Sequence, residues 1–113
     1  MDINFCVTLT TIPSRLKNLH LTIASINRQT LKPHKIFLNI PDKYKRFPNT
    51  YIENKDLENI KKINNIEVIR CKDFGPSTKL MGSLDSIKKY DCVIIVDDDH
   101  EYHNQMCEIF IEE

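Results

Sequence analysis

The sequence predicts an α/β protein, with a Rossmann-like, three-layer αβα arrangement around a mostly parallel sheet. Four short apolar runs rich in β-forming residues alternate with four segments in which apolar residues recur every three or four positions. Turn-forming residues such as Pro, Gly and Asn separate the two kinds of segment. Strands that alternate with helices pair in parallel and are covered on both faces, so this order indicates an α/β fold.

The expected strands span residues 4–10, 35–40, 66–71 and 91–96. Apolar residues at helical spacing follow each strand: Leu16, Leu19, Ile23 and Ile26; Ile52, Leu57, Ile60 and Ile63; Leu80, Leu84 and Ile87, with Met81 beside them; and Met106, Ile109 and Phe110. Pro33 should end the first helix, and Asn64-Asn65 marks the turn before the third strand. Gly75 is expected to provide a turn with positive φ, with Pro76 at the first helical position.

Length and composition indicate one globular domain over residues 1–113. Apolar residues make up 41% of the chain and charged residues 28%, which is ordinary for a soluble domain. We expect no transmembrane segment, because no apolar run is long enough to span a bilayer, and we expect no secretory signal and no nucleic-acid partner. Cys6, Cys71, Cys92 and Cys107 form no Cys-x-x-Cys pair, so buried free thiols in a reducing, cytoplasmic compartment are expected.

Charge is distributed unevenly although the net charge is zero. Residues 90–113 carry eight acidic side chains and no Lys or Arg, whereas residues 1–89 carry sixteen basic and eight acidic side chains. A basic body with an acidic end suits a site that holds both an anion and a cation. The alternative for the last glutamates is a solvated acidic helix.

The predicted topology places two polar loops side by side. If the sheet follows the doubly wound order 3-2-1-4, the first and fourth strands are neighbours, and ligands bind at such a switch point, outside the carboxyl ends of the strands. Residues 10–15 follow the first strand and residues 97–99 follow the fourth, which is the most apolar run of the chain and is expected to be the most buried strand. We therefore expect these two loops to border one crevice.

Three consecutive aspartates, Asp97, Asp98 and Asp99, indicate a metal site in this crevice. In an extended chain Asp97 and Asp99 point to the same side, where two carboxylates about 5.5 Å apart repel by roughly 3 kcal/mol at an effective dielectric near 20. Oxygen ligands favour a hard cation such as Mg²⁺ or Mn²⁺. The alternatives are an exposed turn or helix cap, and a zinc site that would include His100 and His103.

Hydroxyl groups and cations in the neighbouring loops suggest an anionic ligand. Thr10, Thr11 and Ser14 follow the first strand, and Arg15 and Lys79 sit at helix starts. Two cations facing one crevice fit a diphosphate group. Asp73, in the loop before the third helix, either caps that helix or contacts ligand hydroxyls.

Three stretches together resemble the N-terminal, donor-binding half of a GT-A-fold glycosyltransferase, of the family 2 type and related viral and bacterial enzymes. They are residues 8–16 (TLTTIPSRL), 73–80 (DFGPSTKL) and 96–102 (VDDDHEY). The resemblance implies that Thr10, Thr11, Ile12 and Arg15 bind the nucleotide, that Asp73 and Lys79 line the donor pocket, and that residues 97–99 form a DxD motif. In that motif Asp97 and Asp98 contact the donor, and Asp97 and Asp99 hold Mn²⁺ or Mg²⁺.

The resemblance implies a glycosyltransferase that takes a sugar from a nucleotide-diphosphate sugar, with a UDP-sugar favoured, for an unknown acceptor. The chain stops about eleven residues after Tyr102, and His103 stands where relatives often have proline. No residue matches the acceptor half or its catalytic base, so we expect a truncated protein whose site a partner chain or another copy completes. The alternatives are a catalytically inactive nucleotide-sugar-binding or interaction module, and a Mg²⁺-dependent phosphoryl-transfer domain, which usually has an aspartate where this chain has threonine.

Overall fold

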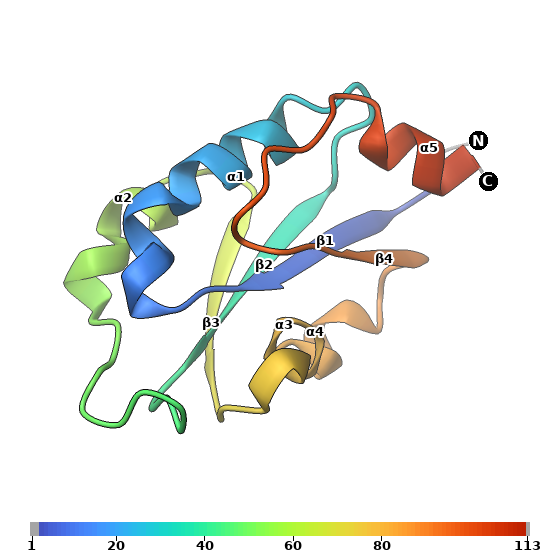
Figure 1. Cartoon of the computed structure of the whole chain (residues 1–113). Coiled ribbons are helices and arrows are strands. Elements are labelled where there is room, and N and C mark those ends of the chain that lie inside the picture. Colours follow the sequence, from blue (N-terminus) through green and yellow to red (C-terminus); the bar gives the residue numbers. More distant parts are fainter. Residues whose placement is uncertain (1–2, 113) are drawn as a thin grey trace.

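The computed structural model describes residues 3–112, and its strands form one parallel sheet in the order β3-β2-β1-β4 (Figure 1). The strands are β1 (Phe5–Thr10), β2 (Lys35–Pro41), β3 (Ile66–Cys71) and β4 (Cys92–Ile95). The predicted α/β class and the predicted strand order are therefore confirmed. Because all strands run the same way, their carboxyl ends share one rim of the sheet.

The two central strands are nearly continuous apolar runs. In β1, Val7 pairs with Ile36 of β2 on one side and with Ile94 of β4 on the other. Residues 5–9 and 36–41 are buried, as is typical of strands covered on both faces. The loop after β1 is thereby anchored to the most rigidly packed part of the molecule.

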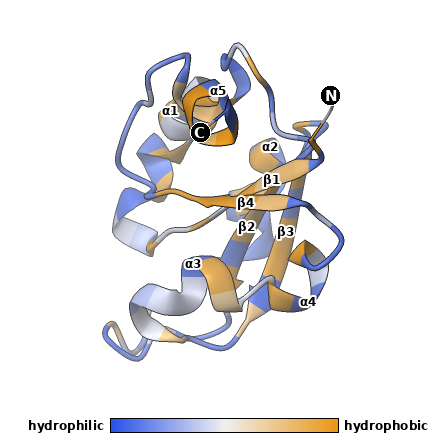
Figure 2. Cartoon of the chain, turned by 90° about the vertical axis from the view of Figure 1, so that its right-hand side faces the viewer, coloured by the Kyte–Doolittle hydropathy of each residue, from blue (hydrophilic) through white to orange (hydrophobic). Residues whose placement is uncertain are grey.

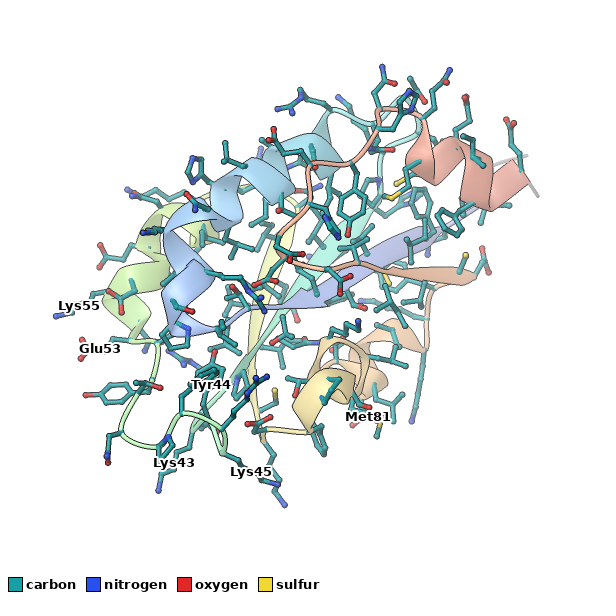
Figure 3. All side chains as sticks on the ribbon, viewed as in Figure 1. Lys43, Tyr44, Lys45, Glu53, Lys55 and Met81 are labelled. Atoms are coloured by element: carbon teal, nitrogen blue, oxygen red, sulfur yellow. The ribbon has the colours of Figure 1, made fainter. Side chains whose placement is uncertain are left out.

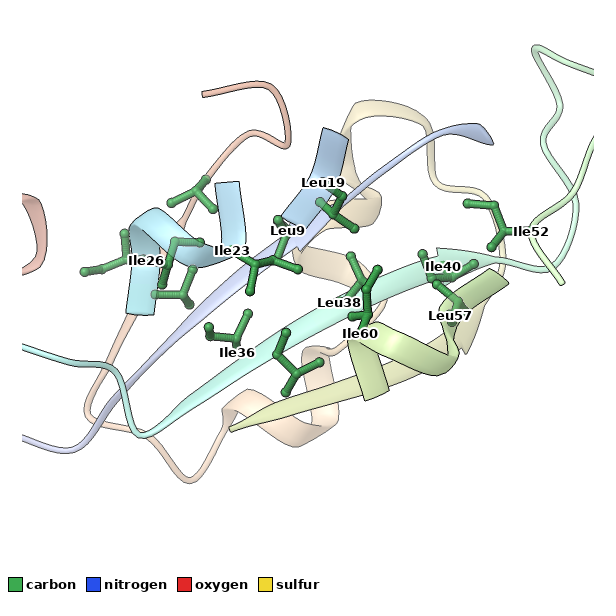
Figure 4. Packing of buried hydrophobic residues seen from close by; sticks show 14 of the residues in the cluster. Leu9, Leu19, Ile23, Ile26, Ile36, Leu38, Ile40, Ile52, Leu57 and Ile60 are labelled. Atoms are coloured by element: carbon green, nitrogen blue, oxygen red, sulfur yellow. The ribbon is translucent and has the colours of Figure 1, made fainter. Parts of the chain in front are cut away.

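Helices of the first and second connections, together with the last helix, cover one face of the sheet. They are η1 (Pro13–Asn18), α1 (Leu19–Asn27), η2 (Asn54–Leu57), α2 (Glu58–Lys61) and α5 (Met106–Glu112). Figure 4 shows Leu19, Ile23 and Ile26 of α1 packed toward Leu9 and Ile36 of the sheet. This is the larger of the two apolar clusters, and it holds the start of α1 close to the end of β1.

A thinner layer covers the opposite face. It consists of η3 (Gly75–Ser77), α3 (Thr78–Met81) and α4 (Leu84–Ile87). Its buried core is Cys6, Phe37 and Ile87. The view along the sheet shows α1 and α5 on one side of the strands and α3 and α4 on the other, which completes the three-layer arrangement (Figure 2).

The single helix predicted after β3 is wrong: two short helices occupy that segment. Gly82 separates them, and a Cβ at this position would lie only 2.7 Å from the Cβ of Asn39 on β2. The chain turns where its backbone packs directly on the sheet, a contact that apolar spacing does not reveal. The expected positive φ of Gly75 is confirmed at 65°, with Pro76 in the first turn of η3.

The expectation that the fourth strand is the most buried is also wrong. Within residues 3–112, β4 pairs with β1 alone and lies at the edge of the sheet. Ile95 is 44% exposed, because α3 and α4 are too short to cover it. The apolar composition of a strand indicates how strongly the strand favours burial. Whether the strand lies at the centre or the edge of the sheet depends on which strands it pairs with.

The four cysteines are free, and they differ in burial. Cys6 and Cys107 are buried, and burial raises the pKa of each thiol to about 11. Cys71 and Cys92 are only half-buried, so the expectation of buried thiols is confirmed for two of the four. No helix among residues 3–112 is long and apolar enough to cross a membrane.

Candidate functional site

The loops after β1 and β4 meet at the carboxyl rim of the sheet, as the strand order predicts. The hydroxyl of Thr11 donates a hydrogen bond of 2.6 Å to the Oδ2 of Asp98. These two residues are 87 positions apart in sequence and are brought together because β1 and β4 are paired neighbours. The expected crevice therefore exists, and Asp97 and Asp98 line it, whereas Asp99 does not.

An open pocket of about 440 Å³ lies at this rim, a volume within the usual range of small-ligand sites. All eight residues that the sequence assigned to nucleotide-sugar binding line it: Thr10, Thr11, Ile12, Arg15, Asp73, Lys79, Asp97 and Asp98. Ser14 is not among the lining residues. The pocket runs across the ends of β2, β1 and β4, so an extended ligand would lie across the strands.

Asp98 is the buried member of the acidic triplet. Its side chain is 6% exposed, and its Oδ2 accepts hydrogen bonds from Thr11 and, at 3.1 Å, from the Nε of Arg15. Its backbone carbonyl accepts a third bond, from the hydroxyl of Thr22 in α1. Asp98 therefore joins β4 to η1 and α1, and it orients the Arg15 guanidinium toward the pocket.

Asp97 lies on the exposed wall of the pocket and carries an ion pair. The Nζ of Lys79 is 3.0 Å from the Oδ1 of Asp97, and the two side chains are 34% and 54% exposed. The backbone N–H of Asp97 donates to the hydroxyl of Tyr102, which holds the loop after β4 in place. Burial raises the pKa of Tyr102, so the phenol stays protonated at neutral pH.

Asp97 and Asp99 point together, and His100 joins them. One ligand atom from each of these exposed residues lies within 4.8 Å of the other two. Two carboxylates and an imidazole are a donor set that divalent Mn²⁺ accepts, and Mg²⁺ would use the carboxylates. These residues fit a divalent cation, with open positions for water and ligand oxygen atoms. Sequence reasoning placed His100 in the zinc alternative, at the surface or near the diphosphate, and did not name it as a ligand of Mn²⁺ or Mg²⁺.

Asp73 acts as a bridge between two loops of the pocket. Its Oδ2 accepts the backbone N–H of Lys45 at 2.9 Å, and its Oδ1 accepts that of Gly75 at 2.8 Å. Partial burial opposes ionisation, but these hydrogen bonds outweigh it and lower the pKa of Asp73. The bond from Gly75 serves the start of η3, in keeping with the capping role, and Asp73 also lines the pocket, so a contact with ligand hydroxyls stays a prediction.

The loop after β2 forms a wall of the pocket that sequence reasoning missed. Tyr44, Arg46 and Phe47 line it, although residues 42–50 read as an ordinary polar loop. Figure 3 shows Lys43 and Lys45 directed outward while Tyr44 lies between them against the body of the protein. The Tyr44 hydroxyl donates to the backbone carbonyl of Thr11 at 2.8 Å. The aromatic residues of this loop were the available signal.

Two further polar residues, Thr10 and His103, have structural roles. The hydroxyl of Thr10 donates to the carbonyl of Asn39 at 2.6 Å and ties β1 to β2. His103 accepts the N–H of Gln105 through its Nδ1, and its carbonyl accepts the amide of Gln29. His103 therefore shapes the turn before α5, and it does not belong to the cluster of Asp97, Asp99 and His100.

Comparison with known proteins adds no relative: no protein-family model and no curated protein matches this chain.

Proposed function

We propose that this chain is the donor-binding part of a metal-dependent glycosyltransferase, which binds a nucleoside diphosphate sugar at the carboxyl rim of its sheet. One observation carries the proposal: the eight residues that the sequence assigned to the nucleotide sugar line a single pocket beside a cluster able to hold a divalent cation. They come from three segments that are far apart in sequence, residues 10–15, 73–79 and 97–98, so their convergence depends on the whole topology.

The chemistry of the pocket suits a nucleoside diphosphate. Arg15, Arg46 and Lys79 offer cationic groups for phosphate oxygens, while Ile12 and Phe47 offer apolar surface for a base or ribose. A divalent cation would be held by Asp97, Asp99 and His100 at the β4 end of the pocket. Bound there, the metal ion would stabilise the charge of the departing diphosphate.

Calorimetry with UDP, GDP and their sugars, with and without Mn²⁺, tests this proposal. We expect binding that strengthens with Mn²⁺ and that Asp99→Ala reduces by at least tenfold, because a metal ligand is lost. Glu101→Ala is the matched control, since Glu101 is an exposed acid two positions away that lies outside the metal-capable cluster. Equal affinities in wild type and Asp99→Ala would refute the site assignment.

Two further measurements separate the alternatives. Release of sugar from a UDP-sugar in the presence of Mn²⁺ would show that the chain turns over its donor, whereas binding without release would indicate a non-catalytic module. A preference for inorganic phosphate analogues over UDP would favour a phosphoryl-transfer domain. The end of β1 argues against that class, because it carries Thr10 and Thr11 in place of an aspartate.

A further inference from the structure

The three cations that line the pocket differ in their partners. Arg15 is paired with Asp98, and Lys79 is paired with Asp97. Among residues 3–112, Arg46 makes no ion pair with a carboxylate. Arg15, Lys79 and Arg46 are the cationic residues that line the pocket, and within residues 3–112 only Arg46 has no acidic side chain as an ion-pair partner.

The loop that carries Arg46 is held firmly against the pocket. The Arg46 guanidinium lies 5.6 Å from the centre of the Phe47 ring. Asp73 binds the backbone N–H of Lys45, and the Tyr44 hydroxyl binds the carbonyl of Thr11. These bonds hold the two residues that precede Arg46, so the loop keeps Arg46 at the wall of the pocket before an anion binds.

Asp97 faces two possible cationic partners, which would repel each other. Its Oδ1 is 3.0 Å from the ammonium group of Lys79, yet its carboxylate also belongs to the cluster with Asp99 and His100. A divalent cation on Asp97 would repel the Lys79 ammonium and release it from the ion pair. The pair of Lys79 and Asp97 is exposed, and exposed ion pairs are weak. A metal ion can therefore replace Lys79 at Asp97 at a small cost in free energy.

The pair of Arg15 and Asp98 behaves differently. Asp98 is buried, is also bound by Thr11, and lies outside the metal-capable cluster. A metal ion at Asp97 and Asp99 would therefore leave Arg15 where it is. Only Lys79 changes partner when the cation binds.

We infer that Arg46 binds the anionic ligand in the metal-free protein, and that Lys79 joins it only after a divalent cation has taken Asp97. This inference rests on the proposed function, since it assumes a phosphate-bearing ligand and a divalent cation in the pocket. It makes binding of the two ligands cooperative, because each frees a group that the other uses. By linkage, Mn²⁺ must strengthen UDP binding by the same factor by which UDP strengthens Mn²⁺ binding.

Titrations of wild type, Arg46→Gln, Arg46→Lys and Lys79→Gln test the inference. UDP binding is measured by calorimetry with and without Mn²⁺, and Mn²⁺ binding by the paramagnetic resonance signal of the free ion. Arg46 and Lys79 each contribute one positive charge to the same pocket, so the two glutamine variants are matched in charge. Thermal unfolding followed by circular dichroism confirms that each variant is folded.

We expect Arg46→Gln to weaken metal-free UDP binding by about tenfold, the loss of one charge-assisted contact, and Arg46→Lys to restore part of it. Lys79→Gln should change metal-free UDP binding by less than about twofold, because Lys79 is then still paired with Asp97. In the absence of UDP, Lys79→Gln should tighten Mn²⁺ binding more than Arg46→Gln does. Lys79→Gln should also remove most of the increase in UDP affinity that Mn²⁺ causes.

Two results would overturn the inference and leave the proposed function standing. One is an equal effect of Arg46→Gln and Lys79→Gln on metal-free UDP binding, and the other is an undiminished increase in UDP affinity with Mn²⁺ in Lys79→Gln. Both presuppose that wild type binds UDP and Mn²⁺. If wild type binds neither, the proposed function fails and this inference fails with it. The two failures are thus distinguished by the wild-type titrations.

Discussion

Replacement of Asp98 by alanine tests whether the middle aspartate is a structural residue. Asp98→Ala removes the acceptor for the Thr11 hydroxyl, and Thr11 is only 1% exposed. A buried hydroxyl left without a partner costs about 1–3 kcal/mol. The lost ion pair adds less than about 1 kcal/mol, because the Arg15 side chain is 48% exposed. We therefore expect the free energy of unfolding to fall by about 2–3 kcal/mol.

Urea unfolding and thermal melting measure this loss. Globular proteins have an unfolding entropy of about 2.1 cal/mol/K per residue, so a chain of 113 residues loses about 4 °C in Tm for each kcal/mol. The expected fall in Tm is about 10 °C. Asp99→Ala is the matched control, because the Asp99 side chain is 49% exposed and has no Lys or Arg partner among residues 3–112. Its effect should stay within about 0.5 kcal/mol.

A double-mutant cycle then identifies the source of the effect. Thr11→Val removes the hydroxyl that Asp98 accepts, so Asp98→Ala should cost less in that background than in wild type. The reasoning is refuted if Asp98→Ala and Asp99→Ala destabilise equally, or if the cost of Asp98→Ala is unchanged in the Thr11→Val protein. In either case the contact between the β1 and β4 loops would not contribute as the structure indicates.

Two further predictions concern the loops around α3. Gly82→Ala should destabilise the protein by about 1–3 kcal/mol in urea unfolding, because its Cβ would meet Asn39 at 2.7 Å; a variant as stable as wild type would contradict the packing of α3 on β2. Asp73→Asn should cost about 1 kcal/mol at pH 7, since the carboxylate accepts the N–H groups of Lys45 and Gly75. The pKa of Asp73 is lowered in the folded state, so its stabilisation is present above about pH 4 and is lost as the pH falls further. The stability difference between wild type and Asp73→Asn should therefore shrink between pH 7 and pH 2.5, and an unchanged difference would argue against an ionised bridge.

Much of the fold and of the site could be predicted because the signals are local and periodic. The observed bounds of β3 agree with the prediction, those of β1 and β2 differ by one residue at one end, and those of β4 differ by one residue at each end. Alternation of strands and helices led to the parallel order, and that order placed residues 10–15 beside residues 97–99. The topology accounts for the meeting of the β1 and β4 loops in the pocket, whereas the wall formed by the loop after β2 was not foreseen.

The roles of individual side chains were beyond the reach of the sequence. Alternation along an extended chain separates Asp98 from Asp97 and Asp99, but it does not reveal that Asp98 is buried while its two neighbours are exposed. Asp73 reads as a candidate ligand-binding residue, and no local pattern reveals that its Oδ2 accepts the backbone N–H of Lys45, 28 positions earlier, while its Oδ1 accepts that of Gly75. Arg46 belongs to a loop that reads as an ordinary polar connection, and only its aromatic residues Tyr44 and Phe47 hinted that it forms a wall of the pocket.

The sequence by itself determined the fold class, the order of the strands and the rim at which the polar loops gather, because these depend on hydrophobic period and on the handedness of parallel connections. Only the tertiary structure decided which charges are paired: Arg15 with Asp98, Lys79 with Asp97, and Arg46 with neither. Ion pairs form over a few ångströms between residues that are distant in sequence. They are set by the register of the strands and the packing of short helices, which no local pattern encodes.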